Sequence, residues 1–599
     1  MAGSRRLAAV GLVAVCALGC GARSSIRYQD FIVSGKLASA LAAAGARRGV
    51  GDTFCADETR YGVTVAPDAT VELRTRLGGA PRLVFDGCAA RAEAGEMTVT
   101  VEGPGGGSIA SRLHVTPSAW SVRSLDLGRF ADEPVTLRLH TGSAAGGRLL
   151  ISRFYVRDRV APTSSPRSPP RLQVLLISLD TLRADAVGAL RDTGTGAGPA
   201  SSSATPALDD FAERGQIWSP HYAAATWTKP SHASLLTGLP VEVHGAELKE
   251  QAISPSVETL AERFRAAGFA TAGLVRNCLW LDRKWGFDRG FDSYRVVLWG
   301  ADQATRAAAD WIEGHRGEPF FYFLHLYTAH SDTHHLPYES EGMHPATVEK
   351  LFGVPDYGCR RGLCASKLLL GIDSGKIAPI PREPEILRYL YTAGVSTADA
   401  ALGRLFRDLR EDGLFDRLLI VVTADHGEGF EEHGKLLHPP EAPYREVLEV
   451  PLLIKWPGGR HAGERRTRPS SSLDLAPTLL AAAGLSVGDL PGSILAERSP
   501  EAPVYSGTTH KSVIAGGLQA IFPPGGGAPE LYDLERDPRE MHDLARRRPG
   551  EVARMRALLQ RRLAADARLR ATLRKDGEAP SPDLSPEERR HLEALGYLQ

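Results

Sequence analysis

The feature that most constrains the fold is a set of apolar runs, without polar alternation, in the second part of the chain. They are VLLISL (174–179), FFYFLHLY (320–327), LLIVVT (418–423) and VPLLIKW (450–456). Strands of this kind are buried on both faces, as in parallel sheets that are covered by helices. Helical stretches lie between the runs, among them TPALDDFAERG and YTAGVSTADAALGRLFRDLRE. The pattern predicts an α/β fold with a mostly parallel, mixed sheet flanked by helices.

Residues 60–157 follow a different pattern, in which short alternating runs are separated by Gly, Pro and Asp. These runs are TVELRTRL, PRLVFDG, EMTVTVEG, PVTLRLHTG and RLLISRFYV. Alternation with period two is typical of strands that have one buried face and one face in water. We therefore expect an N-terminal antiparallel β-sandwich, which serves either as a spacer or as a glycan-binding module.

The stretch APTSSPRSPPR at 161–171 is rich in Pro and Ser and predicts a linker between two domains. The expected organisation follows from it. We expect a signal peptide at 1–19, a β-sandwich domain at 20–160, the α/β catalytic domain at 172–500, and a C-terminal subdomain with a helical tail at 501–599.

The N-terminus has the pattern of a bacterial export signal. Arg5 and Arg6 precede the apolar run LAAVGLVAVCAL, which is too short to span a bilayer. The run ends in Leu18-Gly19-Cys20, which resembles a lipobox with Cys20 as the lipidated first residue of the mature chain. Ordinary signal-peptide cleavage nearby is the alternative. We expect a protein exported to the bacterial cell envelope and attached to the membrane by a lipid, on the periplasmic or outer-membrane face.

An oxidising compartment of this kind permits disulfide bonds. Cys359 and Cys364, in CRRGLC, are expected to close a small loop. The second expected pair is Cys55 with Cys88, which leaves Cys278 as a thiol.

The charge balance argues against a nucleic-acid partner. Lys+Arg and Asp+Glu both total 71, so the formal net charge is zero and no overall field attracts polyanions.

Polar side chains follow the apolar runs at the positions where parallel strands end. Asp180 follows the first run, Asp425 and His426 follow LLIVVT, and His330 follows FFYFLHLY after two residues. Arg276 and Asn277 come after the run FATAGLV. Because ligands bind at the carboxyl ends of such strands, we expect these side chains to form one site. Two Asp and one His predict a divalent-metal site, and the others predict an anion site.

The segment AATWTKPSHASLLTG (224–238) adds a hydroxyl to this site. Pro230 favours the first turn of a helix and Gly238 favours its end, so Thr228 lies where the helix begins. A helix N-terminus attracts anions, and a metal can activate a hydroxyl that lies there for attack on phosphorus or sulfur. The alternative is that Thr228 only caps the helix.

Several motifs, in this order, resemble those of the sulfatase family of the alkaline phosphatase superfamily. They are ISLDTLRAD, TPALDDFAERG, TKPSHASLLTG, VHG, TADHGEGFEEHG, VPLLIKWPGG, LDLAPTLLAAAGL and ELYDLERDPREMHDL. The resemblance covers residues 172–545 and implies a metal-dependent ester hydrolase or phosphotransferase with one or two ions of Ca, Zn, Mn or Mg.

The resemblance also implies roles for single residues. It makes Asp180, Asp425 and His426 metal ligands, together with Thr228, and His330 a contact of the substrate anion. The remaining expected roles are leaving-group assistance by His438 or Lys435, anion binding by Lys229 or His232, and substrate binding by Arg276 or Asn277.

The nucleophile position departs from the sulfatase pattern C/S-x-P-x-R. Here the residues are Thr228-Lys229-Pro230-Ser231-His232, and threonine cannot be oxidised to formylglycine. The resemblance then implies an unmodified Thr nucleophile acting on a phosphate or sulfate ester, with a glycan or lipid headgroup as part of the substrate. Two alternatives stay open: a sulfatase that works without formylglycine, and a non-catalytic, glycan-binding surface lipoprotein.

Overall fold

The structure is a computed structural model. It describes residues 26–30, 36–45, 47–55, 58–78, 81–89, 95–116, 121–142, 149–151, 154–159, 172–191, 203–276, 278–331, 336–338, 345–355, 357–361, 363–573 and 581–582. The predicted signal peptide, the linker at 161–171 and Asn277 lie outside these ranges.

The apolar runs form the centre of a large mixed sheet. Its order there is β16 (Ser293–Val297), β15 (Ala270–Arg276), β17 (Phe320–Leu326), β12 (Gln173–Leu179), β20 (Leu418–Thr423) and β23 (Leu452–Lys455). The first five of these strands are parallel to one another, and β23 is antiparallel to β20. Two short strands, β13 (Gln216–Trp218) and β24 (Arg465–Arg466), complete this edge.

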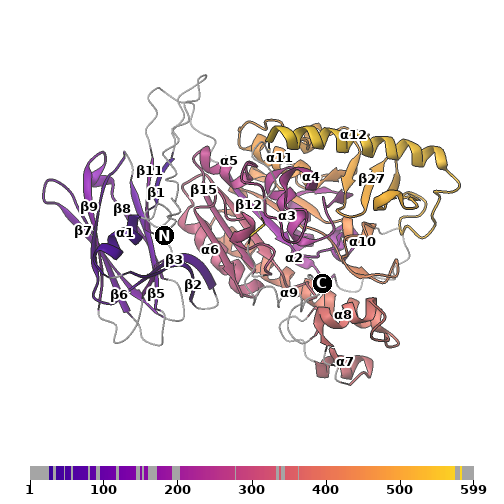
Figure 1. Cartoon of the computed structure of the whole chain (residues 1–599), viewed down its shortest axis with the longest axis horizontal. Helices are drawn as coiled ribbons and strands as arrows, with labels where there is room; N and C mark the ends of the chain where they lie inside the picture. The colour runs from indigo at the N-terminus through magenta and orange to yellow at the C-terminus, as the bar shows by residue number, and fades with distance from the viewer. Residues whose placement is uncertain are drawn as a thin grey trace, which may run out of the picture.

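Helices cover both faces of this sheet, which confirms the predicted α/β class (Figure 1). Alternate residues of β12 enter two different cores: Leu175 and Ile177 face one, Val174 and Leu176 the other. The first core is closed by α2 (Pro206–Arg214), α6 (Ala301–Gly314) and α9 (Glu383–Glu411), and the second by α3 (Thr228–Thr237), α5 (Leu260–Ala266) and α11 (Leu475–Ala482). Burial on both faces explains why the runs show no polar alternation.

The N-terminal part contains the predicted antiparallel β-sandwich, at the left of Figure 1. One sheet has the order β4 (Thr70–Arg76), β9 (Pro134–Thr141), β6 (Gly95–Glu102), β7 (Ser108–Val115). The facing layer contains β1 (Ile26–Asp30), β11 (Phe154–Arg159), β5 (Arg82–Ala89), β10 (Leu149–Ile151), β3 (Glu58–Val65), β2 (Arg47–Cys55) and β8 (Ser121–Asp126). Strands β1, β2, β3, β7 and β8 were not among the predicted runs.

The sandwich is joined to the central sheet by strand pairing. Strand β3 lies antiparallel to β16, with Thr59 opposite Val296 and Glu58 opposite Val297. In the described residues the sandwich layer and the central strands therefore form one 15-stranded sheet. This pairing covers an edge strand that would otherwise expose unpaired backbone groups.

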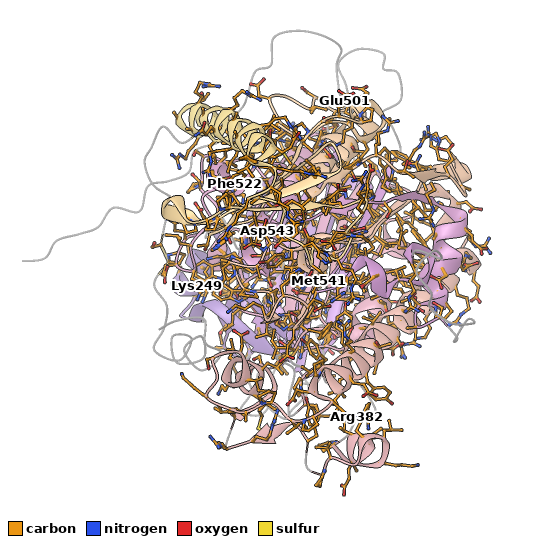
Figure 2. The ribbon with its side chains drawn as sticks, turned by 90° about the vertical axis from the view of Figure 1, so that its right-hand side faces the viewer. Lys249, Arg382, Glu501, Phe522, Met541 and Asp543 are labelled. Carbon is orange, nitrogen blue, oxygen red and sulfur yellow. A yellow bond between two sulfur atoms is a disulfide. The ribbon has the colours of Figure 1, made fainter. Side chains whose placement is uncertain are left out.

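The C-terminal part adds a four-stranded antiparallel sheet and a long helix. The strands are β26 (Val504–Ser506), β27 (Lys511–Ala515), β28 (Leu518–Phe522) and β29 (Glu530–Asp533), and α12 (Pro549–Leu573) packs on them. Helices α7 (Pro345–Phe352) and α8 (Ala365–Asp373) form a projection below the main body in Figure 1. In Figure 2, Arg382 at the base of this projection lies at the opposite end of the molecule from Glu501.

The cysteines follow the predicted pattern where they are described. Cys359 and Cys364 form a disulfide, and Cys278 is a buried thiol. Cys88 is disulfide-bonded, whereas the side chain of Cys55 lies outside the described residues. Lipidation of Cys20 also falls outside them and stays a prediction. Within the described residues, no helix is long and apolar enough to cross a membrane.

A glycine on α9 allows this helix to lie against the loop that follows β17. A Cβ atom on Gly394 would lie 2.5 Å from the carbonyl oxygen of Thr328 and 3.2 Å from the Cα of Ala329. Backbone atoms cannot yield as a flexible side chain can. The contact therefore sets the position of the loop that carries His330.

Gly394→Ala is expected to destabilise the protein by about 1–3 kcal/mol, the usual effect of an overpacked contact. This is opposite in sign to the usual gain of a Gly→Ala change within a helix, which is about 1 kcal/mol. Urea unfolding measures the difference. Gly314→Ala is the matched control, because a Cβ there would meet nothing within 4 Å. Equal stability of Gly394→Ala and the wild type would show that the loop moves without cost.

Candidate active site

The carboxyl ends of β12 and β20 bring three of the predicted metal ligands together. Asp180 directly follows β12, and Asp425 and His426 follow β20 after Ala424. One ligand atom from each of the three lies within 4.8 Å of the others, and all three side chains are buried. The strands are parallel neighbours, so their ends lie at the same edge of the sheet.

Thr228 lies at this cluster and does not cap its helix. It is the first residue of α3, and Trp227 occupies the N-cap position without a side-chain hydrogen bond. The Thr228 hydroxyl is 3.4 Å from Nε2 of His426 and is buried. The capping alternative is therefore wrong, because the hydroxyl faces the cluster and not its own helix.

The protonation of His426 leaves a lone pair in the middle of the cluster. Its Nδ1 donates to the carbonyl of Gly427 at 2.9 Å, and burial lowers the pKa of His426 to about 3. The unprotonated Nε2 lies 3.7 Å from Oδ1 of Asp180 and 3.2 Å from Oδ2 of Asp425. Among the described residues, this Asp425 oxygen is buried without a hydrogen-bond partner. Atoms that accept but do not donate converge here, as they do around a cation.

The carboxyl group of Asp425 is ionised in this setting. Burial opposes its charge, but the neighbouring His426, His232 and His325 rings outweigh burial and hold the pKa of Asp425 well below its usual range. The backbone N–H of Thr181 donates to its Oδ1 at 3.3 Å. The Thr181 hydroxyl itself turns to the carbonyls of Asp180 and Ala329, so it is not part of the ligand set.

His330 and His438 form a second group beside the cluster. The His438 ring lies 4.2 Å from that of His426 and 5.3 Å from that of His330. Nδ1 of His438 bonds to Oε1 of Glu428 at 3.0 Å, and the His330 ring stacks on Tyr327 at 4.2 Å. These two histidines are where the resemblance implied. The sequence analysis missed Glu428, although it lies two residues after His426 in the same motif.

A layer of three polar residues lies beneath the two carboxylates. His232 bonds through Nε2 to Ser178 Oγ at 3.0 Å, and its Nδ1 lies 3.0 Å from the carbonyl of Thr228 and 3.2 Å from Oδ2 of Asp425. His325 Nε2 bonds to Oδ2 of Asp180 at 3.1 Å. Both ring nitrogens of His232 are thus engaged within the protein, which corrects its predicted role as an anion contact. The missed signal was a His and a Ser, each one residue before the end of an otherwise apolar strand.

Lys229 is also not an anion contact. Its ammonium group donates to the carbonyls of Leu248, Lys249 and Gln251 at 2.8, 2.6 and 2.8 Å. The ring of Trp285 lies 4.0 Å from it. Burial lowers the pKa of Lys229 well below its ordinary value, but three carbonyl acceptors match the three donors of the charged form. We therefore assign Lys229 as the charged ammonium form. It holds the 248–251 segment against α3.

Of the remaining predicted residues, Lys435 also points elsewhere. It is 41% exposed and pairs with Asp373 of α8 at 3.6 Å, so its role at the leaving group stays a prediction. Arg276 ends β15 close enough to the cluster that its charge, after burial and His232, helps to lower the pKa of His325. Asn277 cannot be placed, because it lies outside the described residues.

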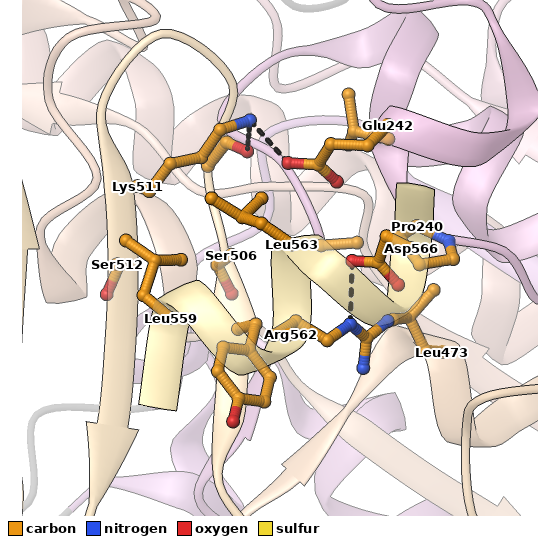
Figure 3. A pocket seen from close by; sticks show the side chains of 14 residues that line it. Pro240, Glu242, Leu473, Ser506, Lys511, Ser512, Leu559, Arg562, Leu563 and Asp566 are labelled. Atoms are coloured by element: carbon orange, nitrogen blue, oxygen red, sulfur yellow. Dashed lines mark hydrogen bonds and ion pairs between the residues drawn. The ribbon is translucent and has the colours of Figure 1, made fainter. Parts of the chain in front are cut away.

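A separate pocket lies between α12, α4 (Val241–His244) and the C-terminal sheet (Figure 3). Lys511 pairs there with Glu242, and Arg562 pairs with Asp566 at 2.8 Å. None of the cluster residues lines it. The first pair joins β27 to α4 and the second lies within α12, and the pocket is not part of the candidate active site.

A second buried group of titratable residues stabilises the loop that carries the cluster. His433 Nδ1 bonds to Glu446 at 2.7 Å, and its Nε2 donates to the carbonyl of Glu540 at 3.1 Å. Burial opposes the charged ring, but the hydrogen bond and the charge of Glu446 raise the pKa of His433 to about 9. Burial raises the pKa of Glu540 to about 8. The charged imidazole ties the loop to the C-terminal part of the chain.

Comparison with known proteins agrees with these motifs. A family model described as Sulfatase matches residues 173–485, more than half of the chain. The chain is 25% identical over 393 residues to the multifunctional alkaline phosphatase superfamily protein PehA of Trinickia caryophylli, covering 52% of this chain and 73% of that protein.

Two solved structures share the fold. One is a protein in complex with its substrate D-glucosamine-2-N,6-O-disulfate, with a TM-score of 0.51 and 19% identity, covering 66% of this chain and 98% of that chain. The other is the phosphonate monoester hydrolase of Agrobacterium radiobacter, with a TM-score of 0.50 and 19% identity. The match covers 67% of this chain and 96% of that chain. At these identities the structures show the fold alone.

The His433 group predicts a loss of stability at alkaline pH. A folded-state pKa of about 9, above the ordinary 6.5, means that its contribution is complete below pH 6.5 and is lost as the pH rises through 9. Glu540 acts in the same direction between 4.5 and about 8, because the folded state keeps a proton that the unfolded state has lost.

His433→Gln is therefore expected to lower the free energy of unfolding at pH 6 by about 1.5–3 kcal/mol, the value of a hydrogen bond to a charged group. The variant should also lose less stability than the wild type between pH 6.5 and 9.5. Thermal unfolding at a series of pH values measures both effects. His542→Gln is the control, because that side chain is 82% exposed. Parallel pH profiles of His433→Gln and the wild type would contradict the prediction.

Proposed function

The chain belongs to the sulfatase family of the alkaline phosphatase superfamily, and from this premise we propose an ester hydrolase or transferase with Thr228 as its nucleophile. The substrate is a phosphate ester, or a sulfate ester as the alternative, attached to a glycan or a lipid headgroup. The observation that carries the proposal is the position of the Thr228 hydroxyl. It lies at the start of α3, 3.4 Å from Nε2 of His426 and within the acidic cluster.

The cluster fits a divalent cation held by Asp180, Asp425, His426 and Thr228. Nε2 of His426 is 3.2, 3.4 and 3.7 Å from the nearest oxygens of Asp425, Thr228 and Asp180. Neighbouring ligands of tetrahedral Zn²⁺ are about 3.3–3.6 Å apart, given bonds of about 2.0–2.2 Å. Ca²⁺, with six or more oxygens at about 2.3–2.6 Å, would have neighbouring ligands at similar separations, so the separations fit either ion. A bound divalent cation would lower the pKa of the Thr228 hydroxyl and offset the charge of the substrate.

The protein's own groups then supply the remaining steps. Oγ of Thr228, its proton lost to solvent, attacks the phosphorus, and the bond from phosphorus to the leaving oxygen breaks. His438 gives its Nε2 proton to that oxygen, while Glu428 orients the ring through Nδ1 at 3.0 Å. Water attacks the phosphorus of the threonine adduct, which restores the hydroxyl and releases phosphate. In a transferase, an acceptor hydroxyl takes the place of water.

The choice of phosphate over sulfate depends on the nucleophile position. The solved structures named above include a phosphonate monoester hydrolase and a protein whose substrate is a sulfated sugar, so the shared fold alone does not favour one ester type. Thr228 cannot become formylglycine, and its hydroxyl already points to the cluster. A threonine ester of phosphate can be hydrolysed by the same site without that modification.

Thr228→Ala is expected to cut turnover of aryl phosphate esters by about 10⁴–10⁶-fold, the scale seen when a nucleophile is removed. Thr228→Ser should keep part of the activity, since the hydroxyl remains. Rapid-quench mass spectrometry of the wild type should detect a phosphoryl group on Thr228. Thr237→Ala is the matched control, because Thr237 lies at the other end of α3 and bonds to Ala233. Hydrolysis of aryl sulfates without any phosphoesterase activity would reject the phosphate preference.

His438→Ala is expected to slow alkyl esters far more than aryl esters, because an aryl leaving group needs little protonation. Protonation of a leaving oxygen by a general acid typically increases the reaction rate by about 10²–10⁴-fold. A series of phosphate esters with leaving groups of graded acidity measures this dependence. Glu428→Gln should give the same trend with a smaller amplitude, since it keeps the ring and weakens its orientation. Equal slowing of all esters would assign His438 a positioning role instead.

A further inference from the structure

The residues beneath the cluster form a closed layer that spans two strands and a helix. Ser178 and His325 are directly opposite each other on β12 and β17, one residue before the strand ends. His232 reaches them from α3: it bonds to Ser178 at 3.0 Å, and its ring lies 5.1 Å from that of His325 at an angle of 89°. All three side chains are at most 1% exposed. The layer is therefore shielded from solvent.

Each carboxylate of the cluster has its own imidazole in this layer. Nε2 of His325 lies 3.1 Å from Oδ2 of Asp180, which leaves Oδ1 on the side of His426. Nδ1 of His232 lies 3.2 Å from Oδ2 of Asp425. An N–H donor on one carboxylate fixes the rotation of its side chain, which sets the direction of its remaining lone pairs.

The hydrogen bonds assign the proton on each ring. The Thr228 carbonyl can only accept, so Nδ1 of His232 carries a proton and donates it to this carbonyl, while Oδ2 of Asp425 lies 3.2 Å from the same nitrogen. Nε2 of His232 faces the hydroxyl of Ser178 at 3.0 Å. The Asp180 carboxylate likewise accepts, so the proton of His325 is on Nε2. One ring therefore faces its carboxylate through Nδ1 and the other through Nε2.

We propose that His232 and His325 are positioning residues that orient Asp425 and Asp180 for the cation, each through one particular ring nitrogen. This inference rests on the proposed function, because it presupposes a cation in the cluster. It also explains the departure from the C/S-x-P-x-R pattern at its last position. An arginine there would bring a permanent charge to compete with the cation for Asp425, whereas an imidazole can present an N–H group without a permanent charge.

The ring nitrogens make a crosswise test available. The amide nitrogen of Asn lies about where Nδ1 of His lies, and that of Gln lies about where Nε2 lies. His232→Asn and His325→Gln therefore keep the donor, while His232→Gln and His325→Asn keep a similar amide but move it out of reach. The Kd of the full chain for Zn²⁺ alone is measured by competition with a chelator, without any substrate.

The mismatched variants are expected to bind Zn²⁺ about 10–100-fold more weakly than the wild type, the usual cost of losing such an outer hydrogen bond. The matched variants should recover most of this loss. Asp425→Ala serves as the reference for a destroyed site. Thermal unfolding in the presence of EDTA compares the stability of the Asn and Gln variants at each position. A general packing defect would lower the unfolding temperature of both variants equally.

The outcomes separate this inference from the proposed function. A wild-type chain that binds no divalent cation would overturn the metal-dependent function and this inference with it. A wild-type chain that binds Zn²⁺, with all four variants binding equally well, would overturn the positioning role alone. Equal weakening by both amides at either position would likewise overturn it, because the effect would then come from volume and not from the hydrogen bond.

Discussion

The parallel pairing of β12 with β20 is the constraint on which the rest of the site depends. It ends two buried strands at one edge of the sheet and brings Asp180 and Asp425 together there. Two ionised carboxylates in a buried position repel each other, and each costs several kcal/mol to desolvate. The surrounding residues therefore have to offset this charge, and a divalent cation is the simplest group that does so.

Much of the nearby structure holds this cluster in place. Arg183, which follows β12 closely, pairs with Asp185 and Glu432 at 2.6 Å each and donates to the carbonyl of Glu428 at 2.9 Å. Ser231 Oγ donates to the carbonyl of Asp425 at 2.6 Å, which ties α3 to the end of β20. These contacts limit how far the carboxylates can move apart. The same loop carries Glu428 and His438, so the candidate metal ligands and the proposed acid are positioned together.

The fold class could be predicted because burial leaves a direct trace in the sequence. Strands with helices on both faces read as continuous apolar runs, and the sandwich strands with one face in water alternate. The candidate ligands Asp180, Asp425 and His426 were predictable for the same reason, since each lies at the end of such a run. Strands β7 and β8 were missed because exposed residues dominate SIASRLHV and SVRSLD, which leaves too few apolar positions to mark a strand.

By itself, the sequence determined the class of the fold, the family motifs and the residues at the strand ends, because all of these depend on local order along the chain. Only the tertiary structure decided which polar side chains face the cluster. Lys229, next to the proposed nucleophile in sequence, points into a cage of carbonyls and indole rings, whereas His325, far from it in sequence, bonds to Asp180. The direction of a side chain depends on what packs around it, and those neighbours come from segments that are brought together only when the sheet forms.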